Sequence, residues 1–555
     1  MNKRLVSFLL IMMLLLSLGA SAYAEEGGRK GDIVILYTSD IHCGIDEGFG
    51  YAGLYAVREY LKAQGCTVLL VDNGDNIQGE PVGTMTKGRD CIELMNQMGY
   101  DVAIPGNHEF DYGAENFLSL VKLAKFPYIS CNFNRQGELV FDPYLIKEAD
   151  GVKIAFVGVT TPQSLTKSTP KYFQDENGNF LYGFFQDKTG EGVYNAVQSA
   201  IDGARADGAD YVIVLGHMGN LEASHPWTYA DVISHTSGID AFLDGHSHDT
   251  EQVVMKDKDG REVPRSACGT KMACIGYCRI AVDGSLSCGL YTWNNPDSAP
   301  AMLGVKNAMS KAVDKALDGL GSELKQVVAS SAVALTINDP VEVDSNGFPI
   351  RMIRRAETNM GDFCADAYRD QAGADIAFVN GGGIRVSIPA GKITLNDILM
   401  VHPFGNALCV VEVTGQQILD ALEWSVRSVP NEEGGFQQVS GLSFEVHSYI
   451  PSPCVSDENK MFVSISGERR VKNVLVGGEA IDPAKTYTLA SHNYMLLNDG
   501  GGFTMLRGAP LLQDCVKLDN QVLIDYITET LGGVVGEEYA DPYGQGRIVM
   551  IEEKP

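Results

Sequence analysis

Apolar runs that each end in a short polar motif are the sequence feature that most limits how this chain can fold. The runs are residues 33–37, 68–71, 211–215 and 241–243. Each is apolar at successive positions, and a strand of that kind is typically buried on both faces rather than half exposed. Segments with helical spacing, such as 55–64 and 91–98, alternate with these runs. The alternation predicts a layered α/β domain.

The polar motifs contain residues that bind metal ions. They are Asp40-Ile41-His42, Gly74-Asp75-Asn76, Gly216-His217-Met218 and Gly245-His246-Ser247-His248. In open α/β sheets, sites form at the carboxyl ends of the strands, so we expect these side chains to gather at one edge. A single Asp-x-His motif is weak evidence, but five ordered Asp, Asn and His signals favour a metal site over five separate structural explanations.

The fifth signal is the loop Gly106-Asn107-His108-Glu109-Phe110-Asp111, which follows the apolar stretch 102–104. Asn107 offers a neutral amide oxygen to a hard cation, and the carboxylate of Asp111 is placed to orient the ring of His108. Taken alone, the hexapeptide is also compatible with a polar turn after a strand. Its companion motifs favour the chemical interpretation.

Together these motifs resemble the signature of the calcineurin-like metallophosphoesterases. With the C-terminal motifs described below, the chain resembles the 5'-nucleotidases that have UDP-sugar hydrolase activity, over nearly all of its length. The resemblance implies a four-layer α/β/β/α sandwich followed by a smaller α/β nucleotide-binding domain. It also implies two divalent metal ions, and mixed nitrogen and oxygen ligands suit Zn, Mn, Co or Fe.

The same resemblance assigns roles to individual residues. The implied metal ligands are Asp40, His42, Asp75 and His248 for one ion and Asp75, Asn107, His217 and His246 for the other. In this arrangement Asp75 bridges the two ions of a phosphoester hydrolase. His108, oriented by Asp111, then stabilises the transition state and protonates the leaving oxygen.

A second cluster lies in the C-terminal half. The loop Asn380-Gly381-Gly382-Gly383-Ile384-Arg385 follows the apolar run 376–379. Glycines allow backbone N–H groups to approach phosphate oxygens, and an arginine adds a charge-assisted contact. A flexible turn is the alternative reading of three glycines. By resemblance, the residues that bind the phosphates and sugar of a nucleotide are Arg354, Asn380, Gly382 and Arg385.

Two phenylalanines, Phe436 and Phe503, each follow a pair or triplet of glycines. Composition alone favours two core residues. The resemblance instead implies that both rings stack on the nucleobase, an interaction of about 1–3 kcal/mol per base. One feature departs from the family pattern, because the acid expected shortly after the second aromatic is missing. Arg507 intervenes, and the next carboxylate is Asp514.

The N-terminus has the pattern of a secretory signal peptide. Lys3 and Arg4 precede an apolar run at 5–18, and Ala22-Tyr23-Ala24 forms a small-x-small cleavage site. The apolar run is shorter than the roughly 20 residues that a membrane-spanning helix needs. We therefore expect an exported protein, periplasmic or extracellular, with no stable membrane insertion after the signal is cleaved.

A chain of 555 residues exceeds the usual size of a single hydrophobic core. The predicted divisions are a signal peptide at 1–24, a metallophosphoesterase catalytic domain at 30–300, a helical linker at 301–328 and a 5'-nucleotidase C-terminal substrate-binding domain at 329–550. Because the chemical motifs precede residue 250 and the substrate motifs follow residue 350, we expect the substrate to bridge two domains that move relative to each other.

The net charge of -28 argues against binding to a nucleic-acid polymer. It also repels a phosphate substrate, so local cations are needed at the site. The twelve cysteines lack the density and spacing of a disulfide framework, and we expect few disulfides. In particular, Cys268, Cys274, Cys278 and Cys288 do not form the paired spacing of a zinc site and are expected to be buried thiols.

The predicted function is an exported dinuclear-metal phosphohydrolase. Its expected partner is a nucleotide or nucleotide-sugar substrate: it removes phosphate from nucleoside 5'-monophosphates and also cleaves UDP-sugars. Two alternatives remain open. A 2',3'-cyclic-nucleotide 2'-phosphodiesterase with 3'-nucleotidase activity shares the motifs, and a non-catalytic exported nucleotide-binding protein represents a different functional class.

Overall fold

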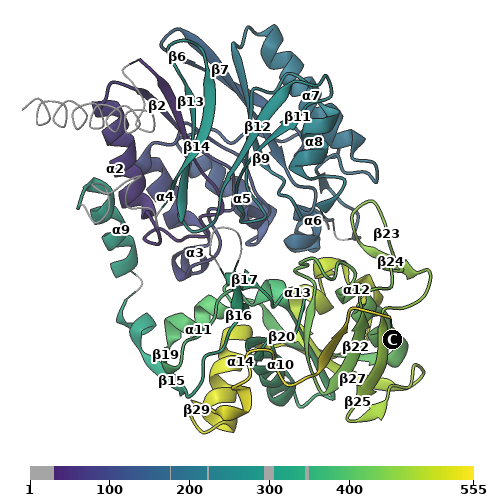
Figure 1. Ribbon diagram of the computed structural model, residues 1–555. Coiled ribbons are helices and arrows are strands. Elements are labelled where there is room, and N and C mark those ends of the chain that lie inside the picture. Colours follow the sequence, from purple (N-terminus) through teal and green to yellow (C-terminus); the bar gives the residue numbers. More distant parts are fainter. Residues whose placement is uncertain are drawn as a thin grey trace, which may run out of the picture.

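The computed structural model of the protein describes residues 31–175, 177–221, 224–292, 306–319, 321–343 and 349–554. The predicted signal peptide lies outside these residues. The chain forms two lobes, the first built from its N-terminal half and the second from its C-terminal half (Figure 1). Within the described part of the chain, no helix has both the length and the apolar character needed to cross a membrane.

Two mixed sheets form the centre of the first lobe. One has the strand order β14-β13-β1-β2-β3 and the other β11-β12-β10-β9-β7-β6. The first contains β1 (Ile33–Thr38), β2 (Thr67–Asp72), β3 (Val102–Ala103), β13 (Cys274–Ile280) and β14 (Leu286–Thr292). The second contains β6 (Tyr144–Ala149), β7 (Val152–Thr160), β9 (Tyr211–His217), β10 (Ala241–Asp244), β11 (Thr250–Lys256) and β12 (Glu262–Cys268).

The two sheets pack face to face, and helices cover their outer faces. Side chains such as Ile35 of β1 and Ile213 of β9 meet in one buried apolar cluster between the sheets. The helices over the first sheet are α2 (Gly50–Ala63), α4 (Arg89–Met98) and α5 (Ala114–Leu123). Those over the second are α7 (Glu191–Ala206) and α8 (Tyr229–His235). The predicted four-layer α/β/β/α sandwich is therefore confirmed.

The register of the strands determines where the polar motifs lie. Strands β1, β2 and β3 run parallel to one another, as do β7, β9 and β10. Their carboxyl ends therefore share an edge in each sheet, and the Asp, Asn and His motifs follow directly after those ends. This edge faces the second lobe, because His42 lies within 3.5 Å of Arg385.

The second lobe is an α/β unit around a five-stranded sheet of order β21-β18-β27-β20-β28. These strands are β18 (Ile376–Asn380), β20 (Ala407–Thr414), β21 (Gln437–Ser440), β27 (Thr486–His492) and β28 (Leu511–Leu518). One face packs against α10 (Asn359–Ala372), α11 (Leu395–Val401) and α14 (Asp519–Asp525). The other packs against α12 (Gly415–Ser425) and a four-stranded sheet that includes β22 (Leu442–His447) and β25 (Val471–Val476).

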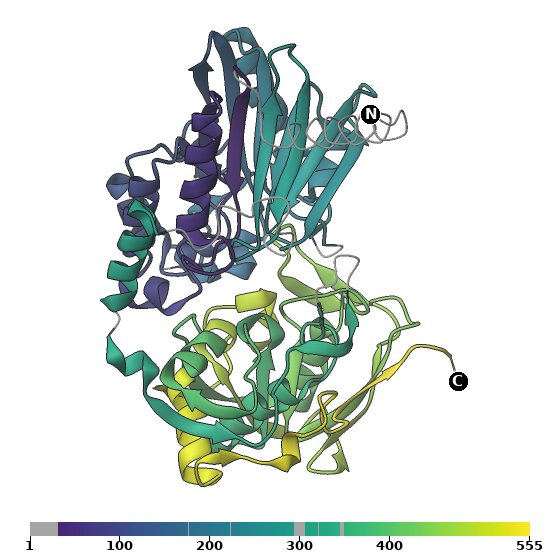
Figure 2. The ribbon, with the colours of Figure 1, turned by 60° about the vertical axis from the view of Figure 1, so that its left-hand side comes forward.

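One helix precedes the crossing between the lobes. It is α9 (Ala308–Asp318), which begins at the capping residue Asn307 and lies beside α2 at the side of the first lobe (Figures 1 and 2). Met309 and Val313 of α9 are buried in the core of the first lobe. By packing, the helix therefore belongs to the first lobe, and the chain crosses to β15 (Val327–Ser331) after it.

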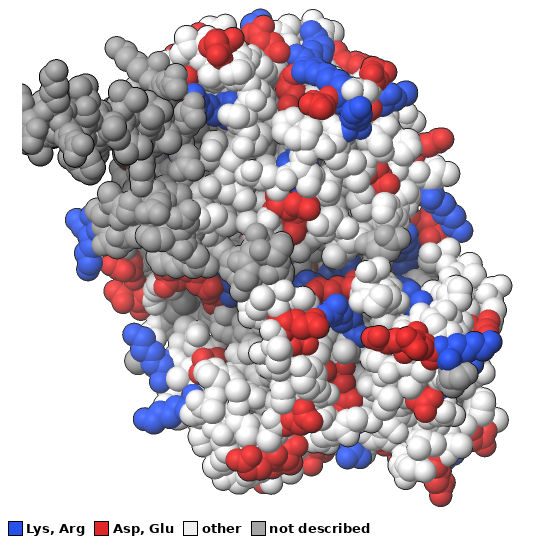
Figure 3. Space-filling model, in the orientation of Figure 1, with Lys and Arg blue, Asp and Glu red and all other residues white. Residues whose placement is uncertain are grey.

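The lobes are in contact, and polar groups join them. Lys167 of the first lobe forms an ion pair with Glu433 of the second. The hydrogen bonds between the lobes include Thr84 to the carbonyl of Pro403 (2.8 Å), Gln186 to Asn459 (2.9 Å), Tyr494 to the carbonyl of Thr166 (2.6 Å) and Lys460 to the carbonyl of His225 (2.5 Å). Acidic and basic side chains are mixed along this seam (Figure 3).

Candidate functional site

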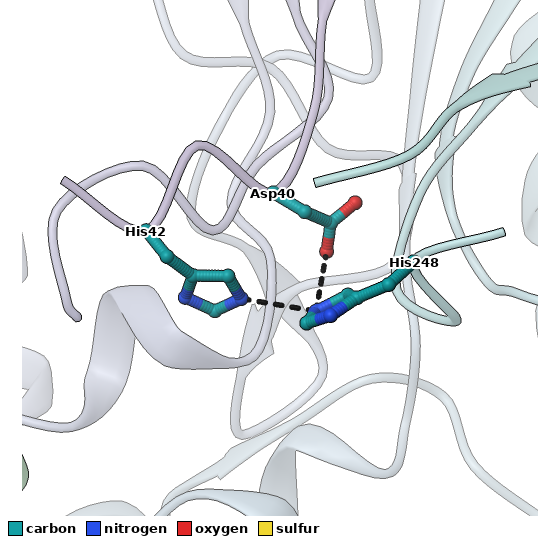
Figure 4. A group of neighbouring side chains, drawn as sticks. All are labelled: Asp40, His42 and His248. Atoms are coloured by element: carbon teal, nitrogen blue, oxygen red, sulfur yellow. Dashed lines mark hydrogen bonds and ion pairs between the residues drawn. The ribbon is translucent and has the colours of Figure 1, made fainter. Parts of the chain in front are cut away.

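The structure brings the seven predicted ligand residues together. Three groups of side chains have ligand atoms that all lie within 4.8 Å of one another: Asp40–His42–His248, His42–Asp75–His108 and Asp75–His217–His246. Figure 4 shows the first of these groups, with Asp40 and His42 from the loop after β1 and His248 from the loop after β10. Asp75 belongs to the other two groups and therefore lies at the centre of the cluster.

Ligand atoms face one another at short distances. His248 Nε2 is 3.0 Å from His42 Nε2 and 3.5 Å from Asp40 Oδ1. His217 Nε2 is 3.1 Å from Asp75 Oδ2. The amide oxygen of Asn107 is 2.7 Å from His246 Nδ1 and 3.3 Å from His217 Nε2. Converging lone pairs of this kind are the arrangement that a cation stabilises.

The second nitrogen of three of these rings is held by the protein. His42 Nδ1 is 3.0 Å from the carbonyl oxygen of Gln78, and His217 Nδ1 is 2.7 Å from that of Asn73. His246 Nε2 is 3.0 Å from the side-chain oxygen of Gln163. An acceptor at one nitrogen places the ring proton there and leaves the lone pair of the other nitrogen free for a metal.

The backbone at these residues is unusual. Five of the seven predicted ligands adopt a positive φ: Asp40 (52°), His42 (47°), Asp75 (58°), His246 (82°) and His248 (60°). Only a few per cent of non-glycine residues do so, and the conformation costs on the order of 1–3 kcal/mol each. Such strain persists where neighbouring structure enforces it, which is typical of a functional site.

Glu109 is one of the groups that enforce this geometry. Its buried carboxylate accepts hydrogen bonds from the backbone N–H groups of Gly106 (2.7 Å), Asp75 (2.8 Å) and Asn76 (2.8 Å), and so ties two ligand loops together. The loops also approach each other closely, since a Cβ on Gly74 would lie 2.4 Å from the backbone nitrogen of Gly106. Glycine is therefore required at position 74.

The residues present fit a pair of divalent cations. Asp40 and Asp75 are almost completely buried, and burial raises the pKa of Asp40 to about 7. Buried carboxylates are normally compensated by a counter-ion or a metal. The donors are imidazole nitrogens and carboxylate or amide oxygens, a set that suits Zn, Mn, Co or Fe. Cys43 instead donates from Sγ to the carbonyl of Asn76 at 3.3 Å and belongs to none of the three groups.

His108 and Asp111 form a hydrogen-bonded pair beside the cluster. His108 Nδ1 is 2.5 Å from Asp111 Oδ2, in the direction predicted from the sequence. Burial alone would lower the pKa of His108, but the carboxylates of Asp111 and Asp75 outweigh it and raise that pKa above its ordinary value. A protonated imidazole held in this way can donate a proton or stabilise negative charge.

A cavity of about 130 Å³ lies against the cluster and is lined by both lobes. Its wall includes Asp75, Asn107, His108, Asp111, His246 and His248 from the first lobe. From the second lobe it includes Arg354, Asn380, Gly382 and Arg385, four of the six predicted substrate residues. The site is therefore shared between the lobes.

Arg354 and Arg385 give this cavity an excess of positive charge. Among the described residues neither has a carboxylate within ion-pair distance, whereas the nearby Arg351 is paired with Glu432 at 2.5 Å. Arg354 Nε is buried without a hydrogen-bond partner. Burial and the adjacent Arg351 lower the pKa of Arg385 to about 10. Two unpaired guanidinium groups beside the metal ligands form an anion site that offsets the negative charge of the whole chain.

The glycine loop does not form the backbone cradle that the sequence suggested. The N–H of Gly381 donates to the carbonyl of Phe436 (2.7 Å), and that of Gly382 donates to the carbonyl of Gly434 (2.8 Å). Both groups are therefore used within the lobe, and that prediction is wrong for these two amides. The glycines are needed for a close approach instead, because a Cβ on Gly381 would lie 2.3 Å from the carbonyl oxygen of Ile353.

The two predicted stacking rings are also placed differently. Phe436 is 0% exposed and Phe503 is 1% exposed, and both belong to the apolar core beside α12. Neither lines the cavity, so in this arrangement they do not clamp a base. The physical reason is the apolar area of the rings, since a fully buried phenylalanine gains about 1.5–3 kcal/mol over an exposed one. The glycines Gly435 and Gly501, which precede them in the chain, line the cavity in their place.

An aromatic residue for which the sequence predicted no role does reach the cavity. The ring of Phe404 lies 5.7 Å from that of His108 and 5.7 Å from the guanidinium carbon of Arg385. Lys167 and Tyr494 also line the cavity. No motif or spacing marks these three residues, because they reach the site only through the contact between the lobes.

Comparisons with known proteins agree with this geometry. A sequence model of the calcineurin-like phosphoesterase family matches residues 33–250, and one of the 5'-nucleotidase C-terminal domain matches residues 327–508. Protein UshA of Escherichia coli (strain K12) is 26% identical, over 92% of this chain and 93% of its own. A 5'-nucleotidase of Vibrio cholerae is 26% identical over 92% of each chain. The crystal structure of a 5'-nucleotidase precursor from Thermus thermophilus superposes with a TM-score of 0.76 at 25% identity, covering 94% of this chain and 100% of that one.

Proposed function

The chain belongs to the 5'-nucleotidase family of metallophosphoesterases, and from this membership we propose that it removes phosphate from nucleoside 5'-monophosphates. Water and the phosphomonoester are consumed, the ester P–O bond breaks, and a nucleoside and inorganic phosphate are formed. The observation that carries the proposal is one cavity in which the Asp/His cluster, His108 and two unpaired arginines meet. We extend the proposal to nucleotide sugars, whose phosphoryl groups need the same contacts.

Two divalent ions are assigned to the cluster. Asp40, His42, Asp75 and His248 would hold one, and Asp75, Asn107, His217 and His246 the other. When bound, such ions lower the pKa of a water molecule and neutralise charge on phosphoryl oxygens. The hydrogen bonds that the three histidine rings donate to oxygen atoms of Gln78, Asn73 and Gln163 keep these rings in orientation for this role.

His108 is assigned the acid role. Asp111 accepts the hydrogen bond from His108 Nδ1, which directs the other ring nitrogen away from the pair. His108 then stabilises charge on the phosphoryl group and donates a proton to the leaving oxygen of the ester. The carboxylates of Asp111 and Asp75 raise the pKa of His108, which favours the protonated ring that this step needs.

Arg354 and Arg385 are assigned to the phosphoryl oxygens, for which bidentate guanidinium contacts are well suited. Asn380 and Gly382 line the same cavity and are assigned to the nucleotide beyond the phosphate. We further propose domains at 30–300 and 329–550 joined by the segment 301–328, whose helix α9 packs on the first lobe, and export directed by residues 1–24. The N-terminal residue of the secreted protein, expected near Glu25, tests the last point.

A substrate panel tests the proposed function. The protein is loaded with Zn, Mn, Co or Fe, and phosphate release is measured directly from AMP and 3'-AMP. For UDP-glucose and 2',3'-cyclic AMP, whose cleavage gives phosphomonoesters, phosphate is measured after these products are treated with a phosphomonoesterase. We expect AMP to be hydrolysed fastest. Faster cleavage of 2',3'-cyclic AMP and 3'-AMP identifies the cyclic phosphodiesterase alternative.

Nucleotide binding without phosphate release from any ester identifies the non-catalytic alternative. A matched pair of variants gives the control for contaminating phosphatases. His108→Asn should lose most of the activity, whereas His235→Asn should keep it, because His235 is exposed on α8 away from the cavity.

A further inference from the structure

A second, larger cavity adjoins the first. Its volume is about 640 Å³, against about 130 Å³ for the first. Four residues line both cavities: His248, Arg354, Arg385 and Glu432. The unpaired Arg354 and Arg385 therefore lie where the two cavities meet. A phosphoryl group bound by these arginines would be next to both cavities.

The walls of the second cavity suit the passage of a small anion. Lys271 is paired with Glu47 at 3.2 Å and also with Glu80, and Arg351 is paired with Glu432 at 2.5 Å. These cations are already neutralised, whereas Arg354 and Arg385 at the junction are not. An anion that moves outward thus leaves its strongest contacts and meets no second site that holds it as tightly.

The second cavity also reaches the surface. Pro349 and Ser387, which line it, are exposed. Two of the contacts that join the lobes involve wall residues of the first cavity, Lys167 and Tyr494, and another, from Thr84 to the carbonyl of Pro403, lies at the wall of the second. Pro349 and Ser387 are nevertheless exposed in this arrangement, so the second cavity stays open to the surface while the lobes are in contact.

We propose that inorganic phosphate leaves through the second cavity while the nucleoside still occupies the first. The inference rests on the proposed function, since it assigns a route to one product of that reaction. It separates the release of the two products: phosphate leaves from the closed enzyme, and the nucleoside leaves when the lobes part. Product release limits turnover in many enzymes, so the route has a kinetic consequence.

Narrowing the second cavity without touching the metal ligands tests the route. Ser387→Trp places a large side chain at an exposed wall position. The Ser387 hydroxyl accepts a hydrogen bond from the backbone N–H of Ile337 at 3.0 Å, so Ser387→Ala is the matched control that loses this bond without adding bulk. Asn338→Trp with Asn338→Ala is a second pair at another wall residue of this cavity, used if the first tryptophan variant does not fold.

Two rates are compared in a single turnover with AMP. Acid quenching measures all the phosphate formed, and a fluorescent phosphate-binding protein measures phosphate that has left the enzyme. In the tryptophan variant we expect formation at the control rate and release slowed by about tenfold or more. Equal release in the tryptophan and alanine variants overturns the route. Absence of phosphate formation in the unmodified protein refutes the proposed function instead, so the two failures are distinguishable.

Discussion

At the scale of the residue, the candidate centre is organised by backbone strain and by hydrogen bonds to ring nitrogens. Positive φ at Asp40, His42 and Asp75 turns these side chains toward a common point. The carbonyls of Gln78 and Asn73 hold the rings of His42 and His217. The strained backbone and the oriented histidine rings are both formed by the protein's own residues, so metal binding needs little rearrangement of these residues.

Replacing His108 by Asn tests the acid role. The variant loses the protonated ring but leaves the ligand residues unchanged, so we expect the turnover number to fall by about 10²–10⁴-fold. The metal content, measured by mass spectrometry, should remain that of the unmodified protein. Retention of the full rate would remove His108 from the mechanism.

Asp75 and Asp40 differ in their predicted effect on metal binding. Asp75 Oδ2 lies 3.1 Å from His217 Nε2 and 3.9 Å from His42 Nε2, one residue from each proposed ligand set, whereas Asp40 is assigned to one set. Asp75→Asn should therefore weaken both ions together, while Asp40→Asn should weaken mainly one. Metal-to-protein ratios after dialysis against a chelator check this, and two ions retained by Asp75→Asn at the unmodified ratio contradict the bridge.

The clustering of the candidate ligand residues could be predicted from the sequence, because donor side chains recur directly after strands and the carboxyl ends of parallel strands share an edge. The groups that orient these side chains could not be predicted from the sequence. Backbone carbonyls such as that of Asn73 carry no sequence signal, and Gln163 is distant in the chain from His246, whose ring it contacts at 3.0 Å. These contacts exist only once the loops are folded against one another.

At the scale of the element, the glycine loop after β18 is supported from below by two buried histidines. His402 Nδ1 lies 2.9 Å from the carbonyl oxygen of Gly383, and His492 Nε2 lies 2.8 Å from Asn380 Oδ1. Because the loop also bonds to Gly434 through Gly382, its backbone is fixed by its neighbours rather than free for phosphate. The sequence shows the glycines but not the carbonyl groups that accept hydrogen bonds from the N–H groups of Gly381 and Gly382. For this reason the phosphate-binding backbone cradle was predicted wrongly.

These histidines predict a pH dependence of stability. Burial lowers the pKa of His402 to about 4 and that of His492 to about 3. Unfolded histidines have a pKa near 6.5, so between that pH and the folded values the unfolded chain binds more protons. The free energy of unfolding therefore falls as the pH drops below about 6.5, by roughly 2 kcal/mol per group between pH 6.5 and 5.

Urea unfolding of the full chain at pH 7 and pH 5 measures this loss. His402→Asn removes one titrating group while its amide can still donate to Gly383, so the loss should be smaller in the variant than in the unmodified protein. His235→Asn is the control for an exposed histidine. Identical losses in all three proteins would exclude His402 as a source of the dependence.

At the scale of the whole molecule, the positions of the cations explain how a chain with a net charge of -28 can bind the proposed phosphate substrate. Arg354 and Arg385 stand unpaired at the junction of the cavities, while many other cations, such as Arg351, are paired with carboxylates. The composition shows that the net charge would repel a phosphate, but it does not show where unpaired cations lie in the fold. The closed arrangement also explains why Phe404 and Lys167 were missed, since each reaches the cavity from a segment without a motif.

The ion pair between Lys167 and Glu433 is predicted to hold the lobes closed. Glu433 is 4% exposed and is also paired with Arg427 at 2.9 Å, so closure places Lys167 beside a buried carboxylate. Burial of this kind makes the pair less sensitive to screening by salt than a surface pair. Lys167→Met keeps the length of the side chain and removes the charge, which should shift the lobes toward an open arrangement.

We expect Lys167→Met to raise the KM for AMP by about tenfold, which corresponds to roughly 1.4 kcal/mol of lost closure energy. X-ray scattering of the nucleotide-free protein should give a larger radius of gyration than that of the unmodified protein. Lys188→Met, a change at a lysine that lines neither cavity, is the control for lost charge.

Because Lys167 also lines the first cavity, a change in KM alone does not distinguish loss of closure from loss of a contact to the substrate. The variant Glu433→Gln distinguishes the two. Glu433 does not line the cavity, so if closure is the cause, Glu433→Gln reproduces both effects and the double variant adds little to either single change. An unchanged radius of gyration in both single variants would show that the pair does not hold the lobes together.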